Sequence, residues 1–391
     1  MKYDFDKVVN RRGTDAVKWE VGPDELPMWV ADMDFQTAPE ICEALGERVK
    51  HGIFGYTDVP SCWRSAYVNW WQTRHGFAME GEALIFCTGV IPAISSAVRK
   101  LTTPNEKVII QTPVYNIFFN CIQNNGCRVS KNPLIYENGQ YRMDFEDLEE
   151  KMADPQTTLM LLCNPHNPVG KIWDRETLLK VAELAERHHV TIISDEIHCD
   201  LTAPGKDYVP FASISKAARD MSIVCVAPTK AFNLAGIQTA AVYVWNPLLR
   251  HKIWRALNTD EVAEPNAFAV TAAETAFEKG GDWLDELREY LWENRRIVTE
   301  ALKAEIPDVF VVEGDATYLL WIDVSALPGN SMEIAGFLRK KTGLYLTGGM
   351  QYGTGGEHHL RMNIACPKEL LNDGVERLVR GLKLYRETAG V

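Results

Sequence analysis

Short apolar runs alternate with longer amphipathic segments from about residue 82 onward, a pattern typical of strands joined by crossover helices. The helix expected over residues 174–189 has a continuous apolar face, as a helix that covers a sheet does. Parallel neighbours in a sheet need such crossovers. The runs expected to form strands of this sheet are residues 83–87, 107–111, 158–163, 190–195, 221–227 and 239–245.

The pattern changes after a long charged segment. Residues 283–304 predict one long helix with a charged, wetter side. After it, three short apolar runs predict strands of a smaller mixed sheet, and a last helix closes the chain. These runs are residues 309–312, 318–323 and 360–364, and the helix is expected over residues 368–388. At 391 residues the chain exceeds the usual size of one domain, so we predict two.

Composition narrows the class of protein. Hydrophobic residues make up 46% and charged residues 24% of the chain, which is ordinary for a globular enzyme. The formal net charge of -12 argues against nucleic acid or a membrane as a partner, because both bind basic surfaces. The beginning of the chain lacks the apolar stretch of a signal peptide, and no run is long enough to cross a bilayer.

The nine cysteines are odd in number, scattered, and mostly embedded in apolar runs. They predict reduced core thiols and therefore a cytoplasmic protein. No Cys-x-x-Cys pair indicates a zinc or redox site, and we expect no metal.

Three of the expected strands end in polar residues. Asn167 follows the strand over 158–163, Asp195 ends the next one, and Lys230 lies in the loop after 221–227. Taken singly, such a lysine is usually a solvated loop residue, and such an aspartate often caps a helix. Together they indicate one crevice, since the carboxyl ends of parallel strands share one edge of a sheet.

Gly89 and Val90 open a helix directly after the strand over 83–87. Their backbone N–H groups and the helix dipole form a ready site for a phosphate group. Glycine is also common in any tight turn between a strand and a helix, so this feature gains its meaning from the crevice beside it.

Taken in order along nearly the whole chain, these segments resemble fold-type I pyridoxal phosphate (PLP) enzymes. Within that superfamily they are most similar to the cystathionine β-lyase and cystalysin branch of C-S lyases. The segments that carry the resemblance are VADMDF (30–35), HGIFGYT (51–57), TGVIPA (88–93), TPVY (112–115), NPHNP (164–168), SDEIH (194–198), the loop of Lys230, TYLLW (317–321) and LRMN (360–363).

The resemblance implies an α/β protein of the aspartate aminotransferase-like PLP-dependent transferase fold. A large PLP-binding domain with a mostly parallel seven-stranded sheet is expected over residues 47–285. A smaller α/β domain is expected over residues 286–391, with residues 1–46 packing on it.

The resemblance also implies roles around the cofactor. Lys230 would bind the PLP aldehyde covalently and later remove the substrate Cα proton, while Asp195 would pair with the pyridine nitrogen. Tyr115 would stack on the ring and take part in catalysis. Asn167 would hydrogen-bond the phenolic oxygen, next to His198, which stands where many aminotransferases have a tyrosine.

Further roles concern the phosphate and the substrate. Gly89, Val90 and Thr229 would hold the phosphate, and Gln238 stands where the superfamily often has a phosphate-binding arginine. Arg361 would bind the substrate carboxylate through its forked guanidinium group. Tyr56 would reach the phosphate and substrate of the neighbouring subunit, which implies a homodimer.

The activity implied is cleavage of the Cβ–S bond of L-cystathionine or L-cysteine-type substrates, giving a thiol (homocysteine or sulfide), pyruvate and ammonia. Two alternatives stay open: an aminotransferase of the same fold, and a lyase that also binds a transcriptional regulator. One fold hosts many chemistries, so the motifs separate these only weakly. A nicotinamide-dependent dehydrogenase is disfavoured because no Gly-x-Gly-x-x-Gly follows the first strands.

Overall fold

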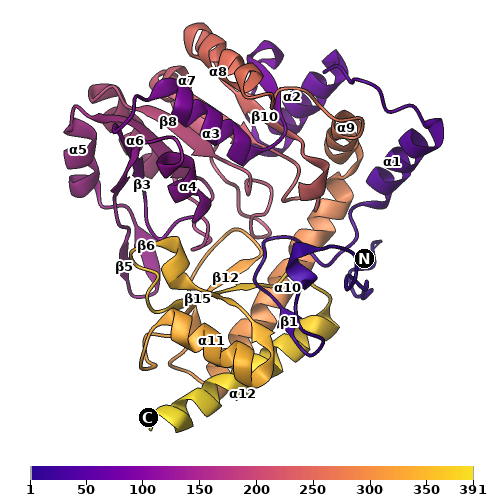
Figure 1. The fold of residues 1–391 in the computed structure, drawn as a ribbon, viewed down its shortest axis with the longest axis vertical. Helices are drawn as coiled ribbons and strands as arrows, with labels where there is room; N and C mark the ends of the chain where they lie inside the picture. The colour runs from indigo at the N-terminus through magenta and orange to yellow at the C-terminus, as the bar shows by residue number, and fades with distance from the viewer. Residues whose placement is uncertain (1, 391) are drawn as a thin grey trace.

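The structure, a computed structural model, describes residues 2–390. Its elements form two parts, one above the other in Figure 1, and the long helix α10 (Gly281–Glu305) runs along both. The expected domain bounds at residues 1 and 391 lie outside the described residues. Within these residues, none of the helices combines the length and the apolar character that a bilayer span requires.

The upper part is built on a seven-stranded sheet. Strand β10 runs antiparallel to both of its neighbours, β2 and β9, and the remaining pairs are parallel. The expected mostly parallel seven-stranded sheet is therefore confirmed. In spatial order the strands are β2 (Leu84–Cys87), β10 (Ala240–Tyr243), β9 (Ser222–Val226), β8 (Thr191–Asp195), β7 (Thr157–Cys163), β3 (Lys107–Ile110) and β4 (Arg128–Lys131).

Six of these strands coincide with the apolar runs of the sequence, and β4 does not. Strand β4 lies at the edge of the sheet, and its terminal residues Arg128 and Lys131 are exposed. Charged residues are a common protection of an edge strand against pairing with another chain. They also remove the apolar pattern by which a strand is recognised in a sequence.

Helices cover both faces of this sheet (Figure 1). One face packs on α3 (Val90–Leu101), α4 (Ile117–Gln123) and α8 (Pro247–Thr259). The opposite face packs on α5 (Phe145–Ala153), α6 (Arg175–Arg187), α7 (Lys216–Met221), α2 (Ser61–His75) and α9 (Ala269–Lys279). Because successive residues of a strand point to opposite faces, the central strands are buried on both faces and mainly apolar.

The lower part holds a four-stranded sheet in the order β11 (Phe310–Val311), β12 (Leu319–Asp323), β15 (His359–Asn363) and β14 (Thr347–Gly348). Every pair in it is antiparallel, so the expectation of a mixed sheet was wrong. Strand direction depends on how the connections return to the sheet, which apolar runs do not show. Helices α11 (Ser331–Thr342) and α12 (Lys368–Ala389) belong to this part (Figure 1).

The beginning of the chain contacts this C-terminal part. Strand β1 (Leu26–Pro27) pairs in parallel with β13 (Leu344–Tyr345). The backbone N–H of Asn363 on β15 then donates to the carbonyl of Met28 at 2.9 Å. From there the chain leads to α1 (Pro39–His51) beside the upper part (Figure 1). A small hairpin, β5 (Ile135–Glu137) and β6 (Gln140–Arg142), completes the strands.

All nine cysteines lie in the described part of the chain and are free thiols. Seven are buried, as the apolar runs predict, whereas Cys42 and Cys62 are exposed.

Candidate active site

A cavity of about 290 Å³ lies at the carboxyl ends of β7, β8 and β9. Asp195 is the last residue of β8, and Lys230 lies four positions after the end of β9. The shared crevice predicted from the strand ends is therefore present. Eight of the predicted site residues line it: Gly89, Val90, Tyr115, Asn167, Asp195, His198, Thr229 and Lys230.

The Lys230 amine lies in a polar contact inside the protein. Its Nζ donates a hydrogen bond to the carbonyl oxygen of Ala31 at 2.5 Å. Burial and the nearby charge of Arg361 lower the pKa of Lys230 to about 8, while the carboxylates of Asp32 and Asp195 act in the opposite direction. An amine with such a pKa is about one-tenth uncharged at pH 7, far more than an ordinary lysine, and the uncharged form is the one that acts as a nucleophile or base.

Asp195 is a buried carboxyl group that accepts one backbone hydrogen bond, from the N–H of Ile197 at 3.1 Å. Burial raises its pKa to about 6, and the Ile197 N–H and the charge of Lys230 moderate that rise. A cationic ring nitrogen placed against this carboxylate would stabilise the ionised form. The group is thus suited to pair with a pyridinium.

His198 and Asn167 also line the cavity. The Nδ1 atom of His198 is buried and has no protein partner. Burial, with the charges of Lys230 and Arg361, lowers the pKa of His198 to about 3, so the ring is neutral at physiological pH. The Asn167 side-chain oxygen accepts a hydrogen bond from Arg361 Nη1 at 3.3 Å.

Arg361 does not line the cavity and reaches the site through Asn167. Its Nη2 donates to the carbonyl of Trp29 at 2.8 Å, and its guanidinium lies 4.9 Å from the ring centroid of Tyr352. Its Nε atom is buried without a protein partner. A buried guanidinium with an unused donor is suited to bind a carboxylate.

Tyr115 forms another part of the cavity wall and meets Phe118 edge to face, with 6.0 Å between ring centroids. Burial raises the pKa of Tyr115 to about 12, so the phenol stays protonated at neutral pH. It can therefore offer a ring face and a hydroxyl donor.

The N-terminus of α3 opens onto the cavity. Its N-cap, Gly89, has an extended backbone (φ 177°) and provides no side-chain cap, so the first N–H groups of the helix are left for another acceptor. Thr88, Thr229 and Gln238 line the cavity as well. An anion bound here would contact backbone amides, hydroxyls and the neutral side-chain amide of Gln238. Among the described residues that line the cavity, none is an arginine that could take over this role.

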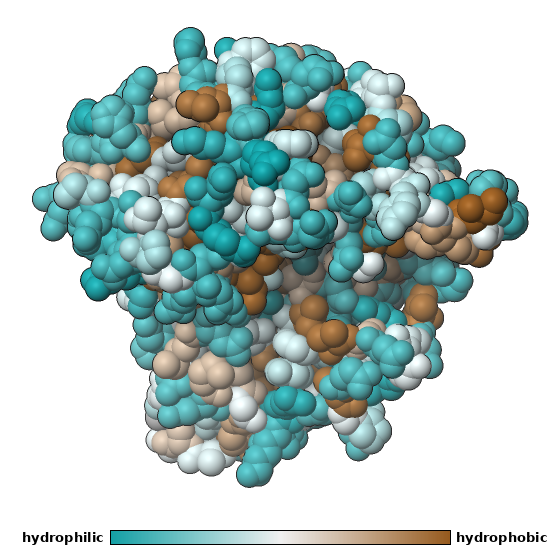
Figure 2. All heavy atoms as spheres, turned by 45° about the horizontal axis from the view of Figure 1, so that its top comes forward, coloured by the Kyte–Doolittle hydropathy of each residue, from teal (hydrophilic) through white to brown (hydrophobic). Residues whose placement is uncertain are grey.

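Tyr56 does not reach the cavity of its own chain. It lies in the connection between α1 and α2 and is fully exposed. Val49, Ile53 and Phe54, close to it in the sequence, are also more than half exposed. Figure 2 shows apolar side chains at the right-hand tip of the molecule, on the side where Figure 1 places α1. The contribution of Tyr56 to the site of a neighbouring subunit stays a prediction.

Sequence reasoning assigned no separate role to Ala31, Thr88 and Tyr318. Ala31 and Thr88 line the cavity, and Tyr318 donates to the Ala31 carbonyl at 3.0 Å. Ala31 acts through its backbone oxygen, which leaves no side-chain signature. All three occur in segments that carry the resemblance, and that was the one available signal.

The residues around the cavity fit PLP. A lysine amine, a buried carboxylate and a helix N-terminus face one space, in keeping with the aldehyde, the ring nitrogen and the phosphate of that cofactor. The unpartnered Nδ1 of His198 and Nε of Arg361 add two buried polar atoms that need an external partner.

Comparisons with known proteins agree with this arrangement. The family model for aminotransferase class I and II matches residues 24–378. The chain is 44% identical to cystathionine beta-lyase PatB of Bacillus subtilis (strain 168), over 97% of this chain and 99% of that protein. It is 32% identical to protein MalY of Escherichia coli (strain K12), over 98% and 100%. The crystal structure of cystalysin from Treponema denticola, which contains a pyridoxal 5'-phosphate cofactor, superposes with a TM-score of 0.95 at 32% identity, covering 98% of this chain and 99% of cystalysin.

Proposed function

The chain belongs to the aminotransferase class I and II family, and from this premise we propose that it is a PLP-dependent C-S β-lyase. Its substrates are L-cystathionine or L-cysteine-type amino acids, which it converts with water to a thiol, pyruvate and ammonia. The observation that carries the proposal is the Lys230 amine, with its lowered pKa, in one cavity with the Asp195 carboxylate.

When bound, PLP supplies an electron sink for the bond pair released at the substrate Cα. Asp195 would keep the ring nitrogen protonated, and the N-terminus of α3 with Thr229 would hold the phosphate. Arg361 binds the substrate carboxylate. Lys230 would hold the cofactor through its side-chain amine, and the same amine, when it carries no covalent bond, would remove the Cα proton as a general base.

Elimination is favoured over amino transfer by the names of the relatives and by the cavity wall. PatB is named a cystathionine beta-lyase. Among the described residues that line the cavity, none is an arginine that would pair with the distal carboxylate of aspartate or glutamate. Losing such a charge-assisted bond costs roughly 1.5–3 kcal/mol, so dicarboxylic amino donors should be poor substrates.

Assembly as a homodimer, in which Tyr56 completes the neighbour's site, is part of this proposal and is supported by the exposed apolar residues around it. A cytoplasmic location is supported by the nine free thiols.

Residues 47–285 would form the PLP-binding domain, and residues 286–391 with 1–46 the smaller domain. Because α10 is continuous from Gly281 to Glu305, the boundary would fall inside a helix.

The test incubates the purified protein with L-cystathionine or L-cysteine and measures pyruvate and thiol, with L-glutamate plus a keto acid in parallel. Pyruvate release should exceed amino transfer by a large factor. Borohydride reduction followed by peptide mapping should find the cofactor on Lys230. Efficient transfer from glutamate without pyruvate from any β-thio amino acid would leave the aminotransferase as the better assignment.

A further inference from the structure

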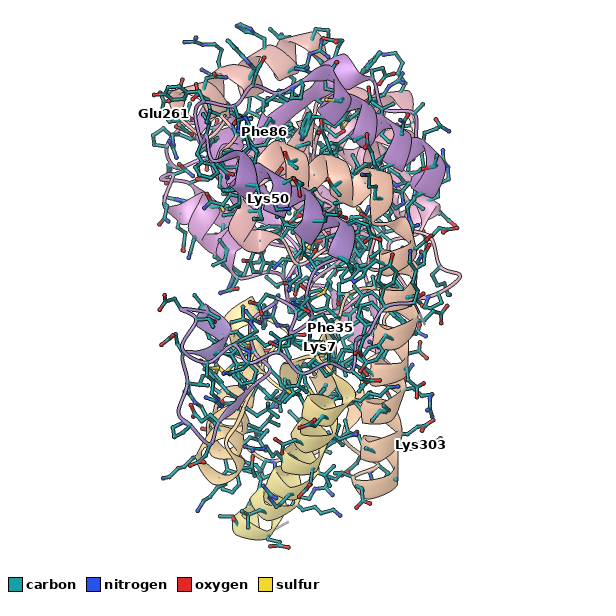
Figure 3. The ribbon with its side chains drawn as sticks, turned by 90° about the vertical axis from the view of Figure 1, so that its right-hand side faces the viewer. Lys7, Phe35, Lys50, Phe86, Glu261 and Lys303 are labelled. Atoms are coloured by element: carbon teal, nitrogen blue, oxygen red, sulfur yellow. The ribbon has the colours of Figure 1, made fainter. Side chains whose placement is uncertain are left out.

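Residues 29–35, here called the strap, cross the junction between the two parts of the molecule. Figure 3 shows Phe35, the last residue of the strap, at the level where the parts meet. The side-chain amide of Asn363, which is buried on β15, donates to the carbonyls of Val30 and Asp32, each at 2.6 Å. The strap is therefore attached through its backbone to the strand that carries the carboxylate-binding arginine.

The same strap is attached to the loop of Lys230. Asn233 accepts a hydrogen bond from the N–H of Met33 at 3.1 Å and donates to the carbonyls of Met33 and Phe35 at 3.1 and 2.9 Å. The backbone of Asn233 is left-handed (φ 55°), a conformation that asparagine tolerates better than most residues. Together with the bond from Lys230 to Ala31, this joins the strap to the catalytic loop.

Two carbonyls of the strap contact the groups that the proposed reaction needs. Ala31 accepts from Lys230 at 2.5 Å and from the buried Tyr318 at 3.0 Å. Trp29 accepts from Arg361 at 2.8 Å. The position of the strap thus determines where the amine and the guanidinium lie relative to each other.

A group of buried charges holds the strap in place. Asp34 is 4% exposed and accepts hydrogen bonds from Lys18 at 2.6 Å, from Arg11 at 2.8 Å and from the Trp19 indole at 2.8 Å. Arg11 also pairs with Asp32 at 2.7 Å. Buried ion pairs offset their desolvation cost poorly, so their better-supported use is to specify one geometry.

We propose that the strap positions the catalytic amine: Lys18, Arg11 and Asp34 fix it, and the Ala31 carbonyl accepts the Lys230 amine whenever that amine carries no covalent bond. The proposal rests on the proposed lyase function. A released amine held by one acceptor keeps a fixed place from which to take the Cα proton, and such orientation is a recognised source of rate. Lys18, Arg11 and Asp34 are positioning residues, since they touch neither substrate nor cofactor.

The charge of Asp32 gives the strap a measurable effect on Lys230. The charged groups facing Lys230 are Asp32 on the strap, Asp195 on β8 and Arg361 on β15, and the neutral His198 lies beside them. Asp32 favours the protonated form of the lysine nitrogen. Removing its charge should therefore make that nitrogen release its proton at a lower pH.

The first experiment titrates the absorbance of the cofactor bound to Lys230 against pH, without substrate. Asp32→Asn should move the midpoint down by about 0.5–1 pH unit, a shift of the size expected for a partly screened charge. Asp323→Asn is the control, because Asp323 accepts hydrogen bonds from Tyr136 and Ser325 instead of facing Lys230. An unchanged midpoint in Asp32→Asn, or an equal shift in the control, overturns the proposal.

The second experiment compares Lys18→Met with Lys18→Arg, using L-cystathionine. Lys18→Met, which lacks the charge, should have a roughly tenfold lower kcat with a smaller change in KM. Lys18→Arg, which keeps the charge, should retain at least half of the wild-type kcat. Equal kcat in all three proteins, or equal losses in both variants, contradicts the proposal. If the wild type releases no pyruvate, the lyase function fails, and the absorbance titration still decides whether the strap acts on Lys230.

Discussion

Lys230 shows how one residue takes on a function through its surroundings. In water a lysine has a pKa of about 10.4 and is almost wholly charged at neutral pH. In this site, burial and Arg361 lower the pKa of Lys230 to about 8, and Asp32 and Asp195 keep it from falling further. The predicted base is thus adjusted by groups from three separate segments of the chain.

The pH dependence of elimination follows from this value. A general base acts when it is deprotonated, so kcat should be low at pH 6 and rise through a midpoint near the lowered pKa of about 8. The measurement is the pyruvate rate at saturating L-cystathionine across pH 5.5–9.5, an interval of about four units chosen around that value. A rise centred below about pH 6 would mean that another group is the base.

Arg361→Gln tests the carboxylate site. The change removes a charge-assisted bond, so KM for L-cystathionine should rise roughly 10- to 100-fold. It also removes a positive charge that lowers the pKa of Lys230, so the midpoint of kcat should move to higher pH. Arg339→Gln is the control, because Arg339 pairs with Glu25 away from the cavity. An unchanged KM would show that another group binds the carboxylate.

At the scale of elements, strand β15 is positioned by a tightly packed turn. Gly349 and Gly356 precede this strand, and their backbones are so close that a Cβ on either would overlap the carbonyl of the other. Close backbone approach of this kind requires glycine. The turn therefore brings two backbone segments into close contact just before β15, the strand that carries Arg361.

Two glycine substitutions should change the free energy of unfolding in opposite directions. Gly356→Ala has no space for its methyl group and should destabilise the protein by about 1–3 kcal/mol while raising KM. Gly336 lies at an exposed position of α11, with no atom within 4 Å of a new Cβ, so Gly336→Ala should stabilise the protein by up to about 1 kcal/mol with unchanged kinetics. Chemical denaturation and steady-state kinetics check both, and equal stabilities would contradict the packing argument.

At the scale of the whole molecule, Tyr56 and its apolar neighbours form an exposed surface. Val49, Ile53 and Phe54 are each more than half exposed. Exposed apolar patches in soluble proteins commonly mark interaction surfaces. In the proposed homodimer this surface would be covered, and Tyr56 would enter the other subunit's cavity.

Hybrid dimers test that arrangement. Subunits with Tyr56→Phe and subunits with Lys230→Ala should each have reduced activity, whereas their heterodimer has one site with both native residues. The heterodimer should recover up to half of the wild-type rate, which pyruvate release measures after analytical ultracentrifugation has verified the dimer. Heterodimers without recovery would place Tyr56 outside the neighbour's site.

Features that depend on residues close together in the sequence could be predicted, whereas features that depend on distant residues could not. The family prediction is confirmed, and so is the fold, because buried strands such as β7 and β8 contain recognisable apolar runs and their functional residues lie at the strand ends or a few positions after them. The division into domains and the roles of the site residues stay predictions. Eight predicted residues nevertheless line one cavity.

The sequence by itself determined the family, the positions of six buried strands along the chain and the chemical groups near their ends, since each is recorded in a local pattern of side chains. Only the tertiary structure decided the edge strand β4, the antiparallel pairing of β12 with β15, and the strap. The Ala31 carbonyl accepts a hydrogen bond from Lys230, which lies 199 residues further along the chain. Because every residue has the same backbone oxygen, no side-chain pattern could predict this contact. Such contacts, like the lowered pKa of Lys230, arise from distance and burial after the chain has folded.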